Sequence, residues 1–180
     1  MKAMSGILVS AGLVLALSGC SNIFPMAQPT TSLDATDYQI THFSVDPPKS
    51  TDIVLRISAD SFTHLTMGQL DQVSTVSQNL YERFIDKKAT FRGVPLSKVF
   101  ELAGISGSSR VVFIAADDYR YVDTAQNMIK SKALLAVEMN GKPIAADQGG
   151  PIRIVFPEKT QYASVSDPWV WSLTRISKVK

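Results

Sequence analysis

The stretch ALLAVEMNGKPIAADQGGPIRIVFP, residues 133–157, carries the strongest fold signal in this chain. It begins with an apolar run, and Asn140-Gly141 separates that run from a second one, which is the pattern of a β-hairpin with a two-residue turn. DQGGP (147–151) predicts a tight loop, and IRIVFP (152–157) predicts another strand. The stretch therefore predicts consecutive strands joined by short turns.

Working outward, the segments before this stretch predict both strands and helices. DIVLRISA (52–59) has an aliphatic residue at every second position from Ile53 to Ile57, which predicts a half-buried strand. In THLTMGQLDQV, Thr66 can serve as the N-cap of a short helix. FRGVPLSKVFELAGI (91–105) predicts a helix. Its apolar face consists of Leu96, Val99, Phe100 and Ala103. Pro95 can occupy the first turn, and Gly104 supplies a left-handed stop.

The segments on either side of residues 133–157 predict further strands. RVVFIAADDYRYVD (110–123) begins as an apolar strand and ends in polar and aromatic residues, after which Asp123 or Thr124 can cap a helix in TAQNMIK. WVWSLTRISKV predicts the last strand, with Trp169 and Trp171 on one face. Since helices and strands are mixed without regular βαβ alternation, we expect an α+β fold of mixed and antiparallel sheets with short helices.

The N-terminus predicts export and lipidation. Lys2, the apolar run GILVSAGLVLAL and the small residues after it have the three parts of a bacterial signal peptide, and LSGC resembles the lipobox of bacterial lipoproteins. We therefore expect a signal peptide at 1–19, lipidation of Cys20, a flexible tether at 20–37 and a single domain at 38–180. Ser21 favours the periplasmic face of the outer membrane by resemblance to lipoprotein sorting. Ordinary secretion with cleavage near Cys20 is the alternative.

Composition excludes several classes of chemistry. Cys20 is the only cysteine, so a lipidated protein has no disulfide, no multi-cysteine zinc site and no cysteine nucleophile. Of the 18 Lys and Arg residues, Lys2 falls in the signal peptide, which leaves 17 against 16 Asp and Glu. This balance does not favour a nucleic-acid binder. His42 and His64 have no metal-binding or triad-like spacing, and no catalytic motif is present.

Aromatic and polar residues gather at the ends of the predicted strands. ADDYRYVD contains Asp118 and Tyr119, and YASVSDPWVW contains Tyr162, Asp167 and the two tryptophans. The tryptophans can be walls of a pocket or packing in the core, because aromatic side chains dominate both settings. The residues alone leave these alternatives open.

Four segments together resemble the molybdopterin-binding domain of the sulfite oxidase family. FRGVPLSKVFELAGI, VVFIAADDYRYVD, the stretch 133–157 and SLTRI occur in that family's order and spacing over residues 52–179. The resemblance implies the sulfite oxidase fold. Catalytic members hold molybdenum through a cysteine before the GVPL helix, but STVSQNLYERFIDKKATFRGVPL has no cysteine. Because a soft thiolate has no substitute there, we expect a retained pterin pocket without molybdenum.

Within this family, the small cysteine-free domain, the export signal and the DPWVW segment resemble the PruR-like periplasmic pterin-binding proteins. That resemblance implies a non-catalytic sensor that binds a free pterin, has no obligatory cofactor, and regulates a membrane-bound diguanylate cyclase or phosphodiesterase through its periplasmic domain. The chain would reach the membrane through its lipid anchor and would not bind nucleic acid.

The pterin ring defines the expected site. A flat ring with N–H and NH₂ groups at its edge needs an aromatic face and a carboxylate acceptor, which Asp167 and the neighbouring tryptophans can supply. The candidate ligand-binding residues are Asp167, Trp169, Trp171, Tyr162 as a second wall, Arg153 as a donor, Tyr119 and Asp118. Two alternatives stay open: a molybdopterin oxidoreductase with atypical ligation, and a structural lipoprotein whose pocket is filled by side chains.

Overall fold

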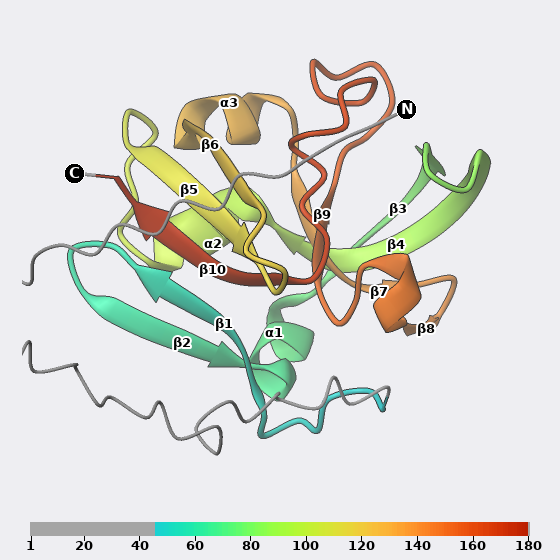
Figure 1. The fold of residues 1–180 in the computed structure, drawn as a ribbon, viewed down its shortest axis with the longest axis horizontal. Helices are drawn as coiled ribbons and strands as arrows, with labels where there is room; N and C mark the ends of the chain where they lie inside the picture. Colours follow the sequence, from blue (N-terminus) through green and yellow to red (C-terminus); the bar gives the residue numbers. More distant parts are fainter. Residues whose placement is uncertain (1–45, 180) are drawn as a thin grey trace, which may run out of the picture. The chain divides into compact units, whose positions relative to one another are not determined.

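The computed structural model describes residues 46–179 (Figure 1). The predicted signal peptide, Cys20, the tether, the domain start at residue 38 and His42 lie outside these residues. No helix within residues 46–179 has the length and hydropathy needed to cross a membrane.

Two β-sheets form most of the described fold. The first has strand order β2-β1-β10-β5-β6, in which β1 and β10 are parallel and all other neighbours are antiparallel. Its strands are β1 (Ile53–Ser58), β2 (Phe62–Thr66), β5 (Arg110–Ala115), β6 (Arg120–Thr124) and β10 (Leu173–Lys178). The second is antiparallel with order β3-β4-β7-β8, and β9 also pairs with β7. Its strands are β3 (Val76–Glu82), β4 (Lys87–Pro95), β7 (Leu134–Met139), β8 (Lys142–Pro143) and β9 (Arg153–Val155).

The helices of the described region are short, which completes the expected α+β architecture. They are α1 (Met67–Val73), α2 (Leu96–Leu102), α3 (Ala125–Lys130) and the 3₁₀ turn η1 (Ala146–Gln148). Thr66 caps α1 as predicted, because its hydroxyl accepts the Gln69 N–H while the Gln69 side chain accepts the Thr66 N–H. Thr124 caps α3 in the same position by accepting the Asn127 N–H at 3.2 Å.

The predicted helix at 91–105 is shorter than expected at its N-terminal end. Pro95 is the N-cap and not a first-turn residue, because it still pairs with Leu134 in the ladder between β4 and β7. The helix ends as predicted, with Gly104 in the left-handed region at φ +65°.

The predicted Asn140-Gly141 hairpin is confirmed. Both residues have positive φ, 54° and 75°, as the twist of a two-residue hairpin requires. Asn140 also ties the turn to β4, because its side-chain oxygen accepts the Thr90 N–H at 2.9 Å. The hairpin therefore fixes β7 beside β4.

Three strand predictions differ from the structure. The polar end of 110–123 folds back as β6, since Asp118 turns the chain at φ +64° and the Asp117 carboxylate accepts the Tyr119 N–H. Ile53 is 43% exposed, because a bulge beside it breaks the alternation of β1. β9 covers only three residues of the predicted strand at 152–157.

One hydrophobic core draws side chains from both sheets. Phe91 of β4, Phe113 of β5, Phe100 of α2 and Phe156 after β9 are all fully buried. The rings of Phe100 and Phe113 lie 6.4 Å apart, which joins α2 to the first sheet. This shared core places the ends of the two sheets beside each other.

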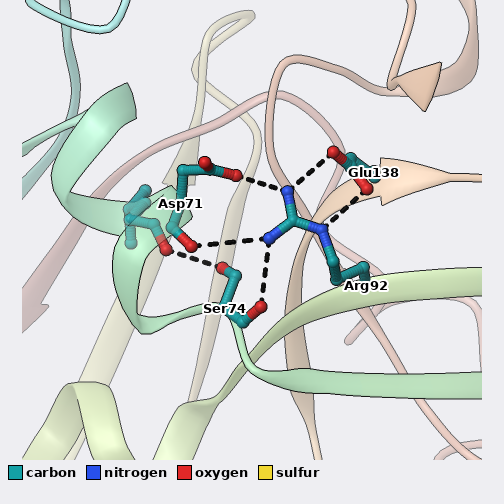
Figure 2. Close-up of polar contacts among 5 residues, drawn as sticks. Asp71, Ser74, Arg92 and Glu138 are labelled. Carbon is teal, nitrogen blue, oxygen red and sulfur yellow. Dashed lines mark hydrogen bonds and ion pairs between the residues drawn. The ribbon is translucent and has the colours of Figure 1, made fainter. Parts of the chain in front are cut away.

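Arg92 in β4 ties α1 to the second sheet (Figure 2). Its guanidinium donates two 2.7 Å hydrogen bonds to the Glu138 carboxylate on β7 and one of 3.0 Å to the Ser74 carbonyl after α1. It also forms an ion pair with Asp71. Hydrogen bonds from Arg92 lower the pKa of Glu138 below its ordinary value. Since the Arg92 and Glu138 side chains are only 29% and 28% exposed, this pair should contribute more than a surface pair.

Arg92→Met should lower the free energy of unfolding by about 2 kcal/mol at neutral pH, because Glu138 and the Ser74 carbonyl lose a charged donor. Glu138 has a depressed pKa, so this stabilisation is complete above the ordinary value of 4.5 and is lost as the pH falls through the folded pKa. Urea unfolding at neutral and acidic pH should therefore show a smaller difference in acid.

The matched control is Lys98→Met, which removes the exposed pair between Lys98 and Glu101 and should cost less than about 0.5 kcal/mol. Equal losses for the two variants at neutral pH would contradict the assigned role of Arg92.

Candidate functional site

A cavity of about 410 Å³ opens where three connecting segments meet, a volume within the range of small-ligand pockets. The segments are the β3–β4 turn, the β5–β6 turn and the irregular chain between β9 and β10. The lining residues are Phe84, Ala115, Asp117, Tyr119, Ser166, Asp167, Trp169 and Trp171. Four of the seven candidate ligand-binding residues are thus brought together here.

A larger cavity of about 750 Å³ lies beside residues 46–56 and 142–151. Its lining includes Lys49, Arg56 and Lys142 but no aromatic side chain and none of the residues selected from the sequence. The smaller cavity is the better candidate because it has the chemistry for a flat ring.

Three aromatic rings form one side of the smaller cavity. The Phe84 ring meets the Trp169 ring at a centroid distance of 6.0 Å and the Trp171 ring at 5.0 Å, both edge to face. Trp169 is buried and Trp171 is half-buried. The Trp169 indole N–H donates to the Tyr162 carbonyl at 2.8 Å, which fixes that ring. The tryptophans therefore serve both as core and as cavity wall.

The prediction that the tryptophans belong to the last strand is wrong. β10 begins only at Leu173. The Trp169 N–H donates to the Ser166 carbonyl and the Val170 N–H to the Pro168 carbonyl, so these groups are used in local turns and not in a ladder. Both rings still reach the same cavity.

Asp167 and Tyr119 form the rim. The Tyr119 hydroxyl donates to the Asp167 backbone carbonyl at 3.1 Å, which links the β5–β6 turn to the chain before β10. Partial burial, followed by the charge of Asp167, raises the pKa of Tyr119, so the hydroxyl stays protonated at neutral pH. Asp167 itself is exposed. Asp118 does not line the cavity, whereas its neighbour Asp117 does.

Arg153 lies behind the aromatic wall. Its guanidinium is 4.5 Å from the centre of the Trp171 ring and 5.8 Å from that of Phe84. It forms a 3.1 Å ion pair with Glu82, and the two side chains are 2% and 1% exposed. Burial lowers the pKa of Arg153 to about 10 despite the opposing effect of Glu82, so the guanidinium remains charged at neutral pH.

Tyr162 does not line the cavity and instead braces it from behind. Its hydroxyl and that of Tyr121 both donate to the Asp123 carboxylate. Burial alone would raise the pKa of Asp123, but hydrogen bonds from Tyr162, Asn127 and the Thr124 N–H lower it overall. This cluster holds the carbonyl of Tyr162 in place beneath the Trp169 indole.

Sequence reasoning missed Phe84, Asp117 and Glu82. The signal for Phe84 was the apolar pair Phe84 and Ile85 inside the otherwise polar segment YERFIDKK. Both side chains are exposed in the structure, as is typical of a binding surface. Glu82 occupies an inward position in the alternation of β3, where Leu80 is also buried, and a charge at such a position is unusual.

Residues 55–179 match the family described as oxidoreductase molybdopterin binding domain. The chain belongs to this family. The fold is also similar to the crystal structure of the sulfane dehydrogenase SoxCD from Paracoccus pantotrophus, with a TM-score of 0.53 and 16% sequence identity. That match covers 74% of this chain and 40% of the other, so this chain spans less than half of that structure's length.

None of the curated protein sequences matches this chain. The family and the structural match together confirm the expected sulfite oxidase-type fold.

The cavity fits the pterin part of the family's cofactor but supplies no thiolate for molybdenum. Residues 46–179 contain no cysteine, and Cys20 lies outside them. The region in which the resemblance places the ligating cysteine contains Phe84 at the cavity wall. No cluster of three or more His, Cys, Asp or Glu side chains suited to a metal occurs in the described part of the chain. Three aromatic rings match a flat ring system.

Gly149→Ala should disturb this site without changing a lining residue. Gly149 has φ +82°, and a Cβ there would lie 2.6 Å from Cγ of Trp171. We expect a loss of about 2 kcal/mol of stability from backbone strain and the clash, together with a shifted emission of Trp171. Fluorescence and thermal unfolding in a Trp169→Phe background would measure both effects.

Gly104→Ala is the matched control, since Gly104 has φ +65° but no atom within 4 Å of an added Cβ. It should cost about 1 kcal/mol from backbone strain and leave the emission unchanged. An identical emission shift in both variants would contradict the predicted contact.

Proposed function

We propose that this protein is a non-catalytic, PruR-like periplasmic pterin-binding protein. A lipid on Cys20 would hold it at a membrane, and its ligand state would regulate a membrane-bound enzyme that makes or degrades cyclic-di-GMP. The aromatic cavity of Phe84, Trp169 and Trp171 carries this proposal, because it lies in a domain of a molybdopterin-binding family that lacks a cysteine for molybdenum.

The cavity offers what a pterin ring needs. The half-buried Trp171 ring provides a stacking surface, and the Phe84 ring on another segment packs against it edge to face at 5.0 Å. Asp167 at the rim is a carboxylate acceptor for N–H groups, and Arg153, buried behind Trp171, would become a charged donor for a ring carbonyl once a wall side chain moves aside. A free pterin would bind through stacking and hydrogen bonds of this kind without any metal.

The surface around the cavity supports a signalling role. Ile85 and Val165 belong to two of the segments that form the cavity and are 43% and 42% exposed. A ligand that moves these segments would change the apolar surface that a partner contacts. Regulation then requires that the partner bind the loaded and empty forms with different affinities.

Protein purified from its own periplasm should release a free pterin on denaturation, detected by mass spectrometry, with no molybdenum in the same sample. Molybdopterin with molybdenum would instead identify an oxidoreductase with atypical ligation. A protein that binds no added pterin and shields both tryptophans from quenchers would be a structural lipoprotein with a filled pocket.

Trp171→Ala should weaken pterin binding by about 2 kcal/mol, the usual contribution of one aromatic stacking partner, which is about thirtyfold in Kd. Titration followed by the fluorescence of the pterin would measure it. Phe62→Ala is the control, because Phe62 is 63% exposed on β2 and does not line the cavity. Equal affinities of the two variants would contradict stacking on Trp171.

Cys20→Ala should release the protein from the membrane fraction and change cellular cyclic-di-GMP in the same direction as deletion of the gene. Trp171→Ala should stay at the membrane and change cyclic-di-GMP because it binds the ligand poorly. Fractionation and nucleotide measurement on the same cultures would test both effects. Unaltered cyclic-di-GMP in the deletion strain would remove the regulatory part of the proposal.

A further inference from the structure

We propose that Glu82 and Arg153 form hydrogen bonds with the edge of the ligand ring. Phe84 covers this pair until the ligand ring displaces the Phe84 side chain. This inference rests on the proposed pterin-binding function and names the residue that sets its specificity. Glu82 was not among the residues selected from the sequence, and Asp167 was the expected acceptor.

Buried polar atoms with incomplete hydrogen bonding concentrate at this point. Of seven such side-chain atoms within residues 46–179, four belong to the Glu82, Arg153 and Trp171 side chains. They are Glu82 Oε2, Arg153 Nε and Nη2, and Trp171 Nε1. Glu82 Oε2 and Arg153 Nη2 lie 3.1 Å apart as an ion pair and so partner each other, whereas Arg153 Nε and Trp171 Nε1 have no polar partner. Because buried charges normally complete their hydrogen bonds, these atoms have unused capacity for a ligand.

The backbone holds the pair from its other side. Glu82 Oε1 accepts the Phe84 N–H at 3.1 Å, and Arg153 Nη1 donates to the Gln148 carbonyl at 2.8 Å. The pair is therefore fixed in position, and a ligand would use Arg153 Nε together with the remaining lone pair of Glu82 Oε2 and the remaining N–H of Arg153 Nη2. Fixed groups of this kind lose little entropy when they bind a ligand.

The free atoms complement a ring carbonyl that adjoins an N–H. The carbonyl would accept from Arg153, and the N–H would donate to Glu82. The 2-amino group of a pterin adds a second donor on the Glu82 side. Asp167 is a weaker candidate for this task because it is exposed, and water competes for its hydrogen bonds.

The rings of Trp171, Phe84 and Trp169 lie between the Arg153 guanidinium and the cavity, and Phe84 is the most exposed of the three. Neither Glu82 nor Arg153 lines the cavity, whereas Phe84 does, and its ring lies 5.8 Å from the Arg153 guanidinium. The side chain is 45% exposed on a turn, so it can leave at a lower cost than a core ring. A ligand ring in its place would meet Trp171 and the charged pair together.

The test compares pterin with lumazine, which has a carbonyl in place of the 2-amino group. The wild-type protein should prefer pterin by at least about tenfold in Kd, because the lumazine carbonyl would face the Glu82 carboxylate. Glu82→Gln should reduce the preference to about threefold or less, since an amide can donate to that carbonyl. Glu101→Gln, at an exposed carboxylate outside the cavity, is the matched amide control and should keep the wild-type preference. Asp167→Asn tests the rim carboxylate as the competing acceptor and should reduce the preference less than Glu82→Gln does.

A preference lost in Asp167→Asn and kept in Glu82→Gln would overturn the inference while leaving the proposed function in place. Binding of neither compound by the wild-type protein would contradict the proposed function itself. If Glu82→Gln does not fold, the double variant Glu82→Met with Arg153→Met removes both charges at similar volume. It should lose the preference, and a preference that persists would also overturn the inference.

Phe84→Ala tests separately, by stopped-flow kinetics, whether the Phe84 ring covers the pair of Glu82 and Arg153. Pterin should associate faster with this variant than with the wild-type protein, because no ring has to leave first. An unchanged or slower association rate would overturn the covering role of Phe84.

Discussion

Four hydrogen bonds between residues 149–154 and residues 170–173 hold the two sheets in the arrangement on which the site depends. The Ser172 N–H and hydroxyl donate to the carbonyls of Gly149 and Gly150, and the Ile154 and Leu173 N–H groups complete the set. One segment leads into β9 and the other into β10. Because they are clamped together, the Trp171 ring lies against Gly149 and over the Arg153 guanidinium.

Arg92 and Arg153 both join elements of the fold, but the role of Arg92 is structural and the role proposed for Arg153 is in binding. Arg92 is half-buried, and its guanidinium reaches two carboxylates and a backbone carbonyl, which makes it a complete structural link. Arg153 is buried, yet its Nε has no hydrogen-bond partner and its Nη2 has only the Glu82 carboxylate, 3.1 Å away. Since burial of an incompletely bonded charge costs free energy, a ligand that completes the bonds would recover that cost.

Local signals in the sequence predicted the elements that depend on a few neighbouring residues. The Asn140-Gly141 turn, the Thr66 and Thr124 caps and the left-handed Gly104 are all present, because each requires only contacts within one turn. The start of the last strand was wrong because the backbone N–H groups of Trp169 and Val170 bond locally. β6 was missed because a hairpin strand exists only through pairing with β5.

The sequence by itself determined the α+β class and an aromatic, cysteine-free domain with Asp167, Trp169 and Trp171 close together, since these follow from composition and short spacings. It also determined the family, through the resemblance of four segments and the match over residues 55–179. Only the tertiary structure decided that Phe84 joins the tryptophans, that Glu82 meets Arg153, and that Tyr162 turns away to Asp123. These contacts join segments far apart in the chain. They are set by strand pairing and by the clamp between the sheets, which local periodicity does not encode.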